Sequence, residues 1–335
     1  MKSKCLVVPR KEGENVRKEL SKKGLLRNDL EIVPDGDFLC IPVTDIPPHS
    51  KYKTKEMDFR VRSVHSGDYR HFLDLPPDLK ALLPASMDFI GDVAVMKLLE
   101  ELEPHKHEIA HALVKAKSVR AVALDRGVQG DLRVRNLEFL IGGEKTTATH
   151  REYGLSYEMD LAKVYFSPRL ASERKRIASM VKEGEIVFDM FCGIGPFSLM
   201  VAKYGAPKKV YSVDINPNAI EYIERNIAIN RLGDKIVPIL DDARRVARSI
   251  EKADRIIMNL PMSAFDFFGD ALHAAKKKCM IHYYEILDRE KVDDRKNDLR
   301  NKAKEMKREL KIDAREVKSY SASSVFWAFD VEVEG

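Results

Sequence analysis

From about residue 166 onward, short apolar runs alternate with amphipathic segments. The apolar runs predict five strands: EIVFDMF, KVYSVDIN, KIVPILDDA, DRIIMNLP and CMIHYYEIL. Helical patterns lie between them, as in PNAIEYIERNIAINRL, where Asn216 suits a helix cap and Pro217 the first helical position. Strands that alternate with helices are typical of a parallel sheet covered by helices on both faces. We therefore expect residues 166–335 to form an α/β domain with a mostly parallel, doubly wound sheet.

The end of this region has a different pattern. A charged helix is expected around residues 289–311, with an apolar stripe made of Leu299, Ala303, Met306 and Leu310. The segments EVKSYSA and VFWAFDVEV follow and predict a terminal hairpin. The sheet should therefore end in an antiparallel strand.

The first 65 residues suggest a small α/β module. CLVVP predicts a strand, GENVRKELSKKGLL a helix, and DLEIVPDGDFLCIPV a hairpin that turns at PDGD. The following IPPHSKYKTK, with two prolines and several charges, is typical of a linker. We expect residues 1–65 to be this module and its linker.

Residues 66–165 mix helical and strand patterns. Helices are expected at LPPDLKALLPASM and HKHEIAHALVKAK, and strands at VRAVALDR, DLRVRNLEFLIG and THREYGLSYEMDL. DFIGDVAVMKL reads as a hairpin that turns at Gly91 and Asp92. This α+β segment is predicted to be a second domain, packed on the third, which spans 166–335.

The composition favours a soluble, cytoplasmic protein. Hydrophobic residues make up 44% and charged residues 33% of the 335 positions, and no run approaches the roughly 18 apolar residues of a membrane span. The four cysteines lie far apart, which argues against a disulfide framework or a zinc site. His107 and His111 are spaced i, i+4 but lack an HExxH pattern and a third ligand, so no metal is expected.

One segment carries more positive charge than the rest. The net charge is only +5, but residues 51–71 carry six Lys or Arg and three acids, interleaved with aromatic residues. Such a pattern suits phosphate contacts and base stacking, although a basic linker explains it nearly as well. Lys53, Arg60 and Arg62 are the candidate RNA contacts. The low net charge and self-contained modules favour a monomer.

The stretch FDMFCGIGPFSL, residues 188–199, predicts a ligand-binding turn. A strand runs into Asp189, and Gly193 and Gly195 allow positive φ and close approach of a ligand. The dinucleotide pattern GxGxxG is missing, because Ser198 stands three residues after the second glycine. The turn therefore fits a nucleoside that lacks a pyrophosphate.

Polar residues follow the next three strands as well. Asp214, which can accept both hydroxyls of a ribose, lies 21 residues after Gly193. Asp242 can accept from an adenine amino group, and NLP at 259–261 ends the fourth strand. Each is weak by itself, since an aspartate at a strand end often only caps the next helix. Together, at the ligand-binding edge of an open sheet, they indicate S-adenosylmethionine.

These motifs carry a resemblance. DxFCGxGPF, VDINPxAI, ILxDAR, NLP and DLAKVYFSPRLASER are similar to archaeal tRNA (guanine-37-N1)-methyltransferases, most specifically over residues 131–261. The resemblance implies a class I methyltransferase fold with an N-terminal module that grips tRNA, and methylation of N1 of guanine-37 from S-adenosylmethionine. Some archaeal members also methylate a tricyclic guanine derivative in wyosine biosynthesis, and the sequence does not separate the two activities.

The resemblance also implies a cofactor site. Its expected residues are Tyr165, Arg169, Asp189, Phe191, Gly193, Gly195, Asp214, Ile215, Asp242, Ala243, Asn259 and Pro261. Tyr165 is also expected to contact the flipped base, since an enzyme that acts on a base edge must hold it unstacked.

Guanine N1 must lose a proton before it can take up a methyl group. The resemblance implies that Glu173 is the general base and that Arg133 stabilises the negative charge on O6. It also implies that Asn259 forms a hydrogen bond with the guanine. Arg135 is the closest rival to Arg133 and a candidate RNA contact. From the residues alone, Glu173 would more readily be a first-turn carboxylate paired with Arg176.

Other functions fit the sequence less well. Cys192 or Cys279 would serve as nucleophile in pyrimidine C5 methylation, but neither follows the third or fourth strand, where such a cysteine stands. NLPM also lacks an aromatic residue after the proline, which suits a ring nitrogen better than an exocyclic amine. A protein or small-molecule methylase, or a non-catalytic RNA-binding protein, fits the basic segment and the intact acidic set less well.

Overall fold

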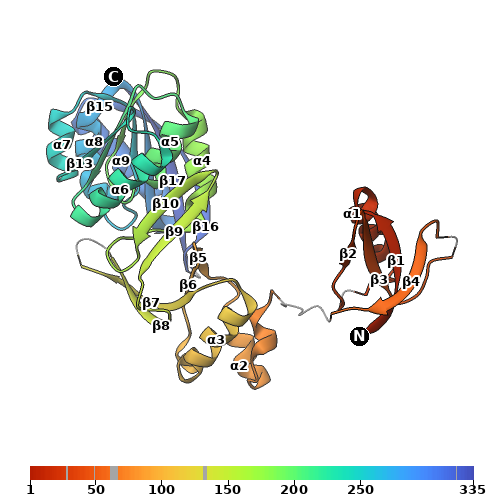
Figure 1. Cartoon of the computed structure of the whole chain (residues 1–335). Coiled ribbons are helices and arrows are strands. Elements are labelled where there is room, and N and C mark those ends of the chain that lie inside the picture. The colour runs from red at the N-terminus through yellow and green to blue at the C-terminus, as the bar shows by residue number, and fades with distance from the viewer. Residues whose placement is uncertain (28, 49, 61–66, 131–133, 322) are drawn as a thin grey trace. The chain divides into compact units, whose positions relative to one another are not determined.

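The computed structural model describes residues 1–335 except 28, 49, 61–66, 131–133 and 322. The chain divides into two compact units, Met1–His71 and Phe72–Gly335 (Figure 1). The sequence placed boundaries after residues 65 and 165, so the structure differs in joining most of the second and third predicted domains into one unit.

The N-terminal unit is an antiparallel sheet with one α-helix. Its elements are β1 Lys2–Pro9, α1 Gly13–Lys22, β2 Val33–Asp35, β3 Phe38–Val43 and β4 Lys53–Asp58, with sheet order β2-β3-β1-β4. The predicted hairpin is present as β2 and β3. The expected linker is partly wrong, because Lys53–Asp58 pairs with β1 instead. This strand lies at the sheet edge with nearly all side chains exposed, so it shows no apolar alternation.

The second unit begins with a small α+β region. Its elements are α2 Pro77–Leu82, β5 Asp88–Ile90, β6 Val93–Met96, α3 Lys106–Ala116, β7 Ala121–Gln129 and β8 Val134–Ile141. The four strands form a sheet in the order β5-β6-β7-β8, and β5 and β6 are the predicted hairpin. A separate hairpin, β9 Thr147–Glu152 and β10 Leu155–Asp160, follows.

A sheet of seven strands forms the centre of this unit. The strands are β11 Ile186–Asp189, β12 Lys209–Asp214, β13 Ile236–Leu240, β14 Ala253–Met258, β15 Ala275–Asp288, β16 Glu309–Ser319 and β17 Ser324–Glu334. Their order is β13-β12-β11-β14-β15-β17-β16. The first five pair in parallel, and β17 is antiparallel to both β15 and β16. The predicted fold class is confirmed, including the terminal antiparallel strand.

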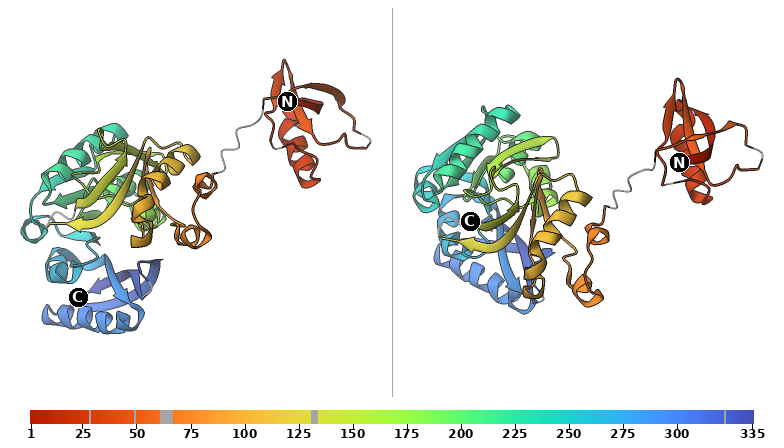
Figure 2. Two further views of the ribbon diagram at one scale, coloured as in Figure 1. Left: turned by 90° about the horizontal axis from the view of Figure 1, so that it is seen from below. Right: turned by 60° about the horizontal axis from the view of Figure 1, so that its bottom comes forward.

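Helices cover both faces of this sheet (Figures 1 and 2). One apolar cluster holds α4 Ala171–Met180, α5 Pro196–Tyr204 and α6 Pro217–Asn230 against one face. Another holds α7 Ala243–Ser249, α8 Phe268–Ala274 and α9 Val292–Glu305 against the other. Alternate residues of β11, such as Val187 and Phe188, belong to the two clusters, as expected for a strand buried on both sides.

The β9–β10 hairpin shares the first of these cores. Tyr157 and Phe166 pack in the same cluster as Phe197 of α5. The amide of Asn226 on α6 accepts from the Glu158 N–H at 2.7 Å and donates to the Glu158 carbonyl at 3.1 Å. The β9–β10 hairpin is therefore packed on the region that holds the large sheet.

The charged helix α9 is shorter than expected. It ends at Glu305, Lys307 adopts a left-handed φ of 57°, and the Arg308 N–H donates back to the Ala303 carbonyl at 3.0 Å. Leu310 consequently lies on β16, not in the helical stripe. Leu299 and Ala303 are buried as predicted.

Candidate functional site

The predicted polar residues meet at the carboxyl edge of the large sheet. Asp189 ends β11 and pairs in register with Ser212 and Ile257, while Asp214 ends β12 opposite Leu240. Asn259 directly follows β14, whose last residue is level with Tyr283. Because the carboxyl ends of parallel strands lie at one edge of a sheet, these residues share the edge at which open α/β sheets bind ligands.

Asp189 is fully buried beneath the turn. Its Oδ2 accepts a hydrogen bond from the Ser198 hydroxyl at 2.7 Å, and Ser198 Oγ in turn accepts one from the Ser212 hydroxyl at 2.8 Å. Its Oδ1 has no hydrogen-bond partner within the described part of the chain. Burial, with the nearby Asp214 charge, raises the pKa of Asp189 to about 7 despite the Ser198 hydrogen bond. The residue supports the turn from below.

The two glycines of the turn have different reasons to be glycine. Both have positive φ, 53° at Gly193 and 84° at Gly195. A Cβ on Gly195 would meet Leu199 Cδ1 at 2.4 Å, so packing forbids a side chain there. A Cβ on Gly193 would meet only the Tyr165 carbonyl oxygen, at 3.9 Å. Gly193 therefore has an open side that a ligand can approach closely.

Asp214 holds this turn in place. Its Oδ2 accepts from the Gly193 N–H at 2.8 Å and its Oδ1 from the Asn216 N–H at 2.9 Å. Burial raises the pKa of Asp214. Each carboxylate oxygen keeps a second lone pair for a ribose hydroxyl. Ile215 follows with 49% of its surface exposed, an apolar surface suited to an adenine ring.

Other predicted cofactor residues have clear structural partners. Asp242 caps α7 by accepting from the Arg244 N–H at 2.8 Å, so it has the helix-capping role common to aspartates at strand ends. Ala243 is buried at 3% exposure. Phe191 packs edge-on against Phe267, with ring centres 5.0 Å apart. The Pro261 carbonyl accepts from the Ile286 N–H at 3.1 Å.

Asn259 differs from these four residues and shares a feature with Asp189: its side-chain oxygen is buried, with no hydrogen-bond partner among the residues that the structure describes. An unpaired buried amide oxygen costs about 1–3 kcal/mol, so such groups are rare unless a ligand satisfies them. The oxygen lies at the end of β14, between the turn after β11 and β15 in the sheet order. The structure therefore offers an acceptor for an N–H donor of a bound molecule.

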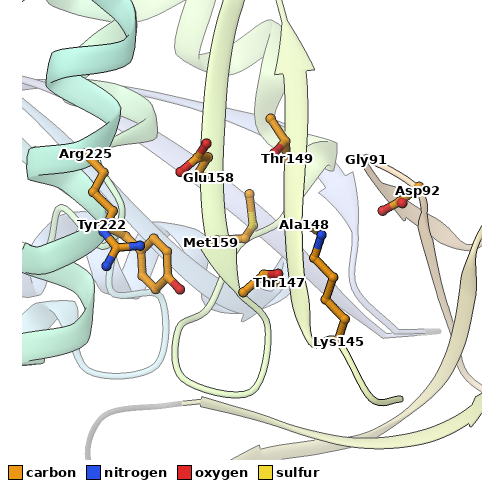
Figure 3. A pocket seen from close by; sticks show the side chains of 10 residues that line it. All are labelled: Gly91, Asp92, Lys145, Thr147, Ala148, Thr149, Glu158, Met159, Tyr222 and Arg225. Atoms are coloured by element: carbon orange, nitrogen blue, oxygen red, sulfur yellow. The ribbon is translucent and has the colours of Figure 1, made fainter. Parts of the chain in front are cut away.

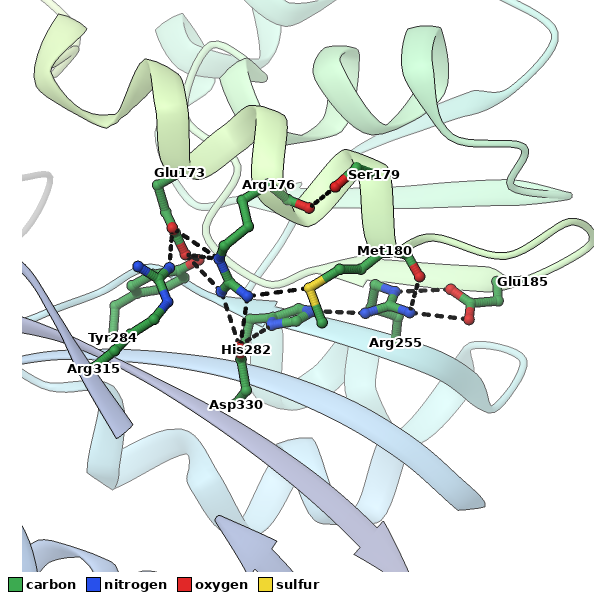
Figure 4. Close-up of polar contacts among 10 residues, drawn as sticks. All are labelled: Glu173, Arg176, Ser179, Met180, Glu185, Arg255, His282, Tyr284, Arg315 and Asp330. Carbon is green, nitrogen blue, oxygen red and sulfur yellow. Dashed lines mark hydrogen bonds and ion pairs between the residues drawn. The ribbon is translucent and has the colours of Figure 1, made fainter. Parts of the chain in front are cut away.

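Glu173, the predicted base, lies in the first turn of α4 with 2% of its surface exposed. Its carboxylate accepts from the Tyr284 hydroxyl at 2.7 Å, from Arg176 at 2.8 Å and from Arg315 (Figure 4). Burial by itself would raise the pKa of Glu173, but hydrogen bonds from Arg176 and Tyr284 outweigh it, and the pKa is lowered. The pairing with Arg176 that the sequence suggested is present.

Glu173 belongs to a longer polar network, which Figure 4 shows between α4 and the sheet. Arg176 also binds Asp330 of β17 at 2.7 Å, and Asp330 lies 2.6 Å from His282 Nδ1. His282 Nε2 lies 2.7 Å from an Arg255 nitrogen. Because arginine only donates, His282 accepts at Nε2 and donates Nδ1–H to Asp330. Full burial lowers the pKa of His282 and keeps the ring neutral.

Asp88 brings two predicted arginines together. Arg135 binds Asp88 Oδ2 at 2.9 Å and Arg169 binds Asp88 Oδ1 at 2.5 Å. The Arg135 guanidinium lies 4.9 Å from the centre of the Tyr165 ring, which is 45% exposed. Neither Asp88 nor Lys318, which lies near this group, was predicted, since no motif marks them. Arg133 and Arg62 lie outside the described residues.

The structure corrects the prediction that the aromatic residues of the basic segment, residues 51–71, stack on RNA bases. Lys53 and Arg60 are exposed, as an RNA contact requires. Phe59 and Tyr69, however, are only 2% and 5% exposed and belong to the core, so they are not free to stack on bases. The interleaved aromatics reflect folding more than recognition.

The cysteines are buried thiols. Burial raises the pKa of Cys279 to about 12 and raises that of Cys192 well above its ordinary value. Thiols held in this state are poor nucleophiles. His107 and His111 are exposed on α3, and no group of three potential metal ligands occurs among the described residues.

A cavity of about 450 Å³ lies elsewhere, between the β5–β6 turn, the β9–β10 hairpin and α6 (Figure 3). Its lining includes Gly91, Lys145 and Arg225 but none of the predicted site residues. It lies away from the strand ends that carry the candidate site.

Comparison with known proteins decides the family. The model of the tRNA methyltransferase 5 N-terminal domain matches residues 5–51, that of the TYW2 N-terminal domain 70–146, and that of the TRM5/TYW2 methyltransferase domain 148–312. The tRNA (guanine(37)-N(1))-methyltransferase Trm5b of Pyrococcus abyssi is 43% identical over 279 residues, covering 83% of this chain and 82% of the relative. The chain belongs to the TRM5/TYW2 methyltransferase family.

Solved structures of the TRM5/TYW2 family agree with this. The crystal structure of Trm5b from Pyrococcus abyssi aligns with a TM-score of 0.75 and 38% identity over 99% of this chain and 100% of that one. The structure of aTrm5 in complex with tRNALeu aligns with a TM-score of 0.74 and 33% identity, over 98% and 99% of the two chains. A further relative, the tRNA 4-demethylwyosine(37)-methyltransferase Taw21 of Saccharolobus solfataricus, is 35% identical over 62% of this chain and 80% of its own.

None of the described helices is long and apolar enough to cross a membrane.

Proposed function

We propose that this protein transfers a methyl group from S-adenosylmethionine to N1 of guanine-37 in tRNA. The observation that carries the proposal is the buried, unpaired Oδ1 of Asn259 at the ligand-binding edge of the sheet. Membership of the TRM5/TYW2 family supports the same activity. The protein acts on tRNA as a cytoplasmic monomer.

The residues at the strand ends fit the cofactor. Asp214 would accept from the ribose hydroxyls, Ile215 would contact the adenine ring, and the open side of Gly193 would admit the nucleoside. Asp242, although it caps α7, would accept from the adenine amino group through its remaining lone pairs. When bound, the cofactor supplies a methyl group already activated on a sulfonium.

The chain's own residues prepare the base. Glu173 would take the N1 proton, so it must first give up one of its present donors, Tyr284, Arg176 or Arg315. Arg133 would stabilise the negative charge that shifts to O6. Asn259 Oδ1 would accept from a guanine N–H and hold N1 in line with the methyl carbon. The N1 lone pair then forms the new bond as the carbon–sulfur bond breaks.

Methyl transfer from labelled cofactor to tRNA transcripts with G37 or A37, followed by nucleoside analysis, tests the proposal. We expect N1-methylguanosine from the G37 transcript and no label in the A37 transcript. Equal labelling of both transcripts would refute methylation at guanine N1.

Methylation of 4-demethylwyosine at the same position is a second candidate. The similarity to Taw21 favours it. A tRNA that carries the tricyclic base, offered beside the G37 transcript, tests this activity separately.

A further inference from the structure

Positive charge exceeds negative charge in one partly buried cluster of the second unit. Arg135 and Arg169 bind the Asp88 carboxylate directly, and Lys318 lies near enough to interact with the charges of all three. A second carboxylate, Asp125, lies 3.9 Å from Arg135 Nη1, beyond hydrogen-bond distance. The three cations thus outnumber the two carboxylates. Arg174 nearby is neutralised by Glu152 in a two-bonded ion pair.

Lys318 is the member without an acceptor. It follows an irregularity in the pairing of β16 with β17, and its amine lies 5.4 Å from the centre of the Phe326 ring. Among the described contacts the amine has no hydrogen bond or ion pair. Burial lowers the pKa of Lys318 to about 8, helped by the charges of Arg169, Arg135 and Arg174 and opposed by Asp88.

Arg135 supplies a second, independent sign of a missing partner. Its side chain is 94% buried, since only 6% is exposed. Among the residues that the structure describes, its Nε and Nη1 nevertheless have no hydrogen-bond acceptor. The residue lines a cavity of about 340 Å³ together with Val134, Asn136, Leu137 and Ala162. Buried guanidinium donors without an acceptor are costly, and an oxyanion satisfies several of them at once.

The cluster lies beside the candidate active site. Arg135 packs against the ring of Tyr165. The backbone carbonyl oxygen of Tyr165 lies next to the open side of Gly193. On the other side, Lys318 lies over Phe326, which packs on Tyr284 at 5.7 Å. Tyr284 in turn donates to the Glu173 carboxylate. An anion held here would be close to both the cofactor turn and the base.

We propose that Arg135, Arg169 and Lys318 form an oxyanion-binding site that takes up either a phosphate of the bound RNA or the methionine carboxylate of the cofactor. The proposal rests on the proposed function, because both anions belong to its substrates. The site adds Lys318 to the residues that bind substrate.

Lys318→Gln in the full chain tests the site, with Lys318→Arg as the conservative variant. Lys311→Gln is the matched control, because Lys311 lies on the same strand and is exposed in a pair with Glu334. Dissociation constants are measured for a G37 tRNA transcript, S-adenosylmethionine and methylthioadenosine, which lacks the carboxylate. Loss of one charge-assisted hydrogen bond should weaken binding about tenfold or more.

The two anions predict different results. If the anion is a phosphate, Lys318→Gln weakens tRNA binding and reduces the slope of log K against log salt by about one, while cofactor affinity stays unchanged. If it is the carboxylate, the variant weakens binding of S-adenosylmethionine but not of methylthioadenosine. Lys318→Arg retains affinity in either case.

The pH dependence of ligand affinity can be measured on the wild-type protein, so this test does not depend on whether a variant folds. In the wild type, affinity for the affected ligand should fall as pH rises through about 8, because the Lys318 amine loses its proton. Lys318→Arg should show no such fall. If neither ligand binds more weakly to Lys318→Gln than to Lys311→Gln, or the wild-type affinities do not change between pH 7 and 9, the site is refuted. Wild-type methylation of G37 would still stand in that event, so the two proposals fail separately.

Discussion

Glu173 presents a conflict between holding and reacting. Its carboxylate is buried and accepts from donors on α4, β15 and β16. These donors keep it ionised at neutral pH, which a base requires, but they also lower its pKa and weaken it as a base. A change in these contacts when substrate binds would raise its basicity.

Glu173→Gln should reduce methyl transfer by about 10²–10⁴-fold, the usual contribution of a general base, because the amide cannot accept the N1 proton. Single-turnover methylation of the G37 transcript measures this loss. Cofactor affinity should stay nearly unchanged, and Glu183→Gln, an exposed carboxylate just after α4, serves as the control. A large loss of cofactor binding would contradict the assignment as base.

Arg315→Ala should shift the acid side of the pH–rate profile to higher pH. The residue donates to Glu173 and helps to lower its pKa, so its removal raises that pKa. Since the reaction requires ionised Glu173, activity would then be lost at a higher pH. An unshifted profile would show that Arg315 does not act through Glu173.

Asn259→Ala should separate activity from stability. The variant removes a buried oxygen that has no hydrogen-bond partner among the described residues, so the thermal unfolding temperature should be unchanged or slightly higher. Methylation should fall about 10–100-fold, which corresponds to one lost hydrogen bond. A destabilised variant would mean that the oxygen has a structural partner after all.

At the scale of elements, the network of Figure 4 joins α4 to the sheet. Asp330 of β17 accepts from both His282 and Arg176, on β15 and α4. Burial would raise the pKa of Asp330, but His282 and Arg176 outweigh it and lower the pKa strongly. A carboxylate with a lowered pKa stabilises the fold above its ordinary pKa, and this stabilisation is lost as pH falls towards the folded value.

Asp330→Asn should therefore destabilise the protein by about 3–5 kcal/mol at pH 7, the usual cost of breaking a buried ion pair. Urea unfolding at several pH values measures this. The difference from wild type should shrink as pH falls below about 4, because the wild type then loses the same contribution. A difference that does not depend on pH would rule out the charge as the cause.

The sequence predicted elements best where burial leaves a pattern. The five parallel strands are buried on both faces and appear as apolar runs, whereas β4 is an exposed edge strand and was missed. The sequence predicts a helix α9 that is too long, because the left-handed turn at Lys307 contains no glycine to indicate the end of the helix.

From the residues alone, the candidate site was predicted only where its residues follow strands, whereas the role of Glu173 rests on the family resemblance. Asp214, Gly193 and Asn259 stand at motif spacing, so their common edge could be inferred. The partners of Glu173 could not be predicted, because Tyr284 is 111 residues and Arg315 is 142 residues away in the sequence. Charged residues within predicted strands carry no local signal of what they face.

At the scale of the whole molecule, the exposed basic residues of the N-terminal unit should contribute to tRNA binding. Lys53→Glu combined with Arg60→Glu should weaken binding of the tRNA transcript. The slope of log K against log salt should fall by about two, which corresponds to the loss of two phosphate contacts. Cofactor affinity should not change, because the strand ends lie in the other unit.

Lys208→Gln is the control for this prediction. The residue is exposed and paired with Glu251 just before β12, at the opposite edge of the sheet from the candidate site. Equal weakening of tRNA binding by this variant would show a general charge effect.

The C-terminal hairpin of β16 and β17 has a consequence for synthesis in the cell. It supplies Arg315 and Asp330, which hold Glu173 and Arg176 of a helix made much earlier. While the ribosome is still adding these residues, the chain already contains its cofactor turn and its proposed base, but the base lacks its fixed surroundings. The enzyme should therefore gain its activity only after residue 330 has been made and the hairpin has closed.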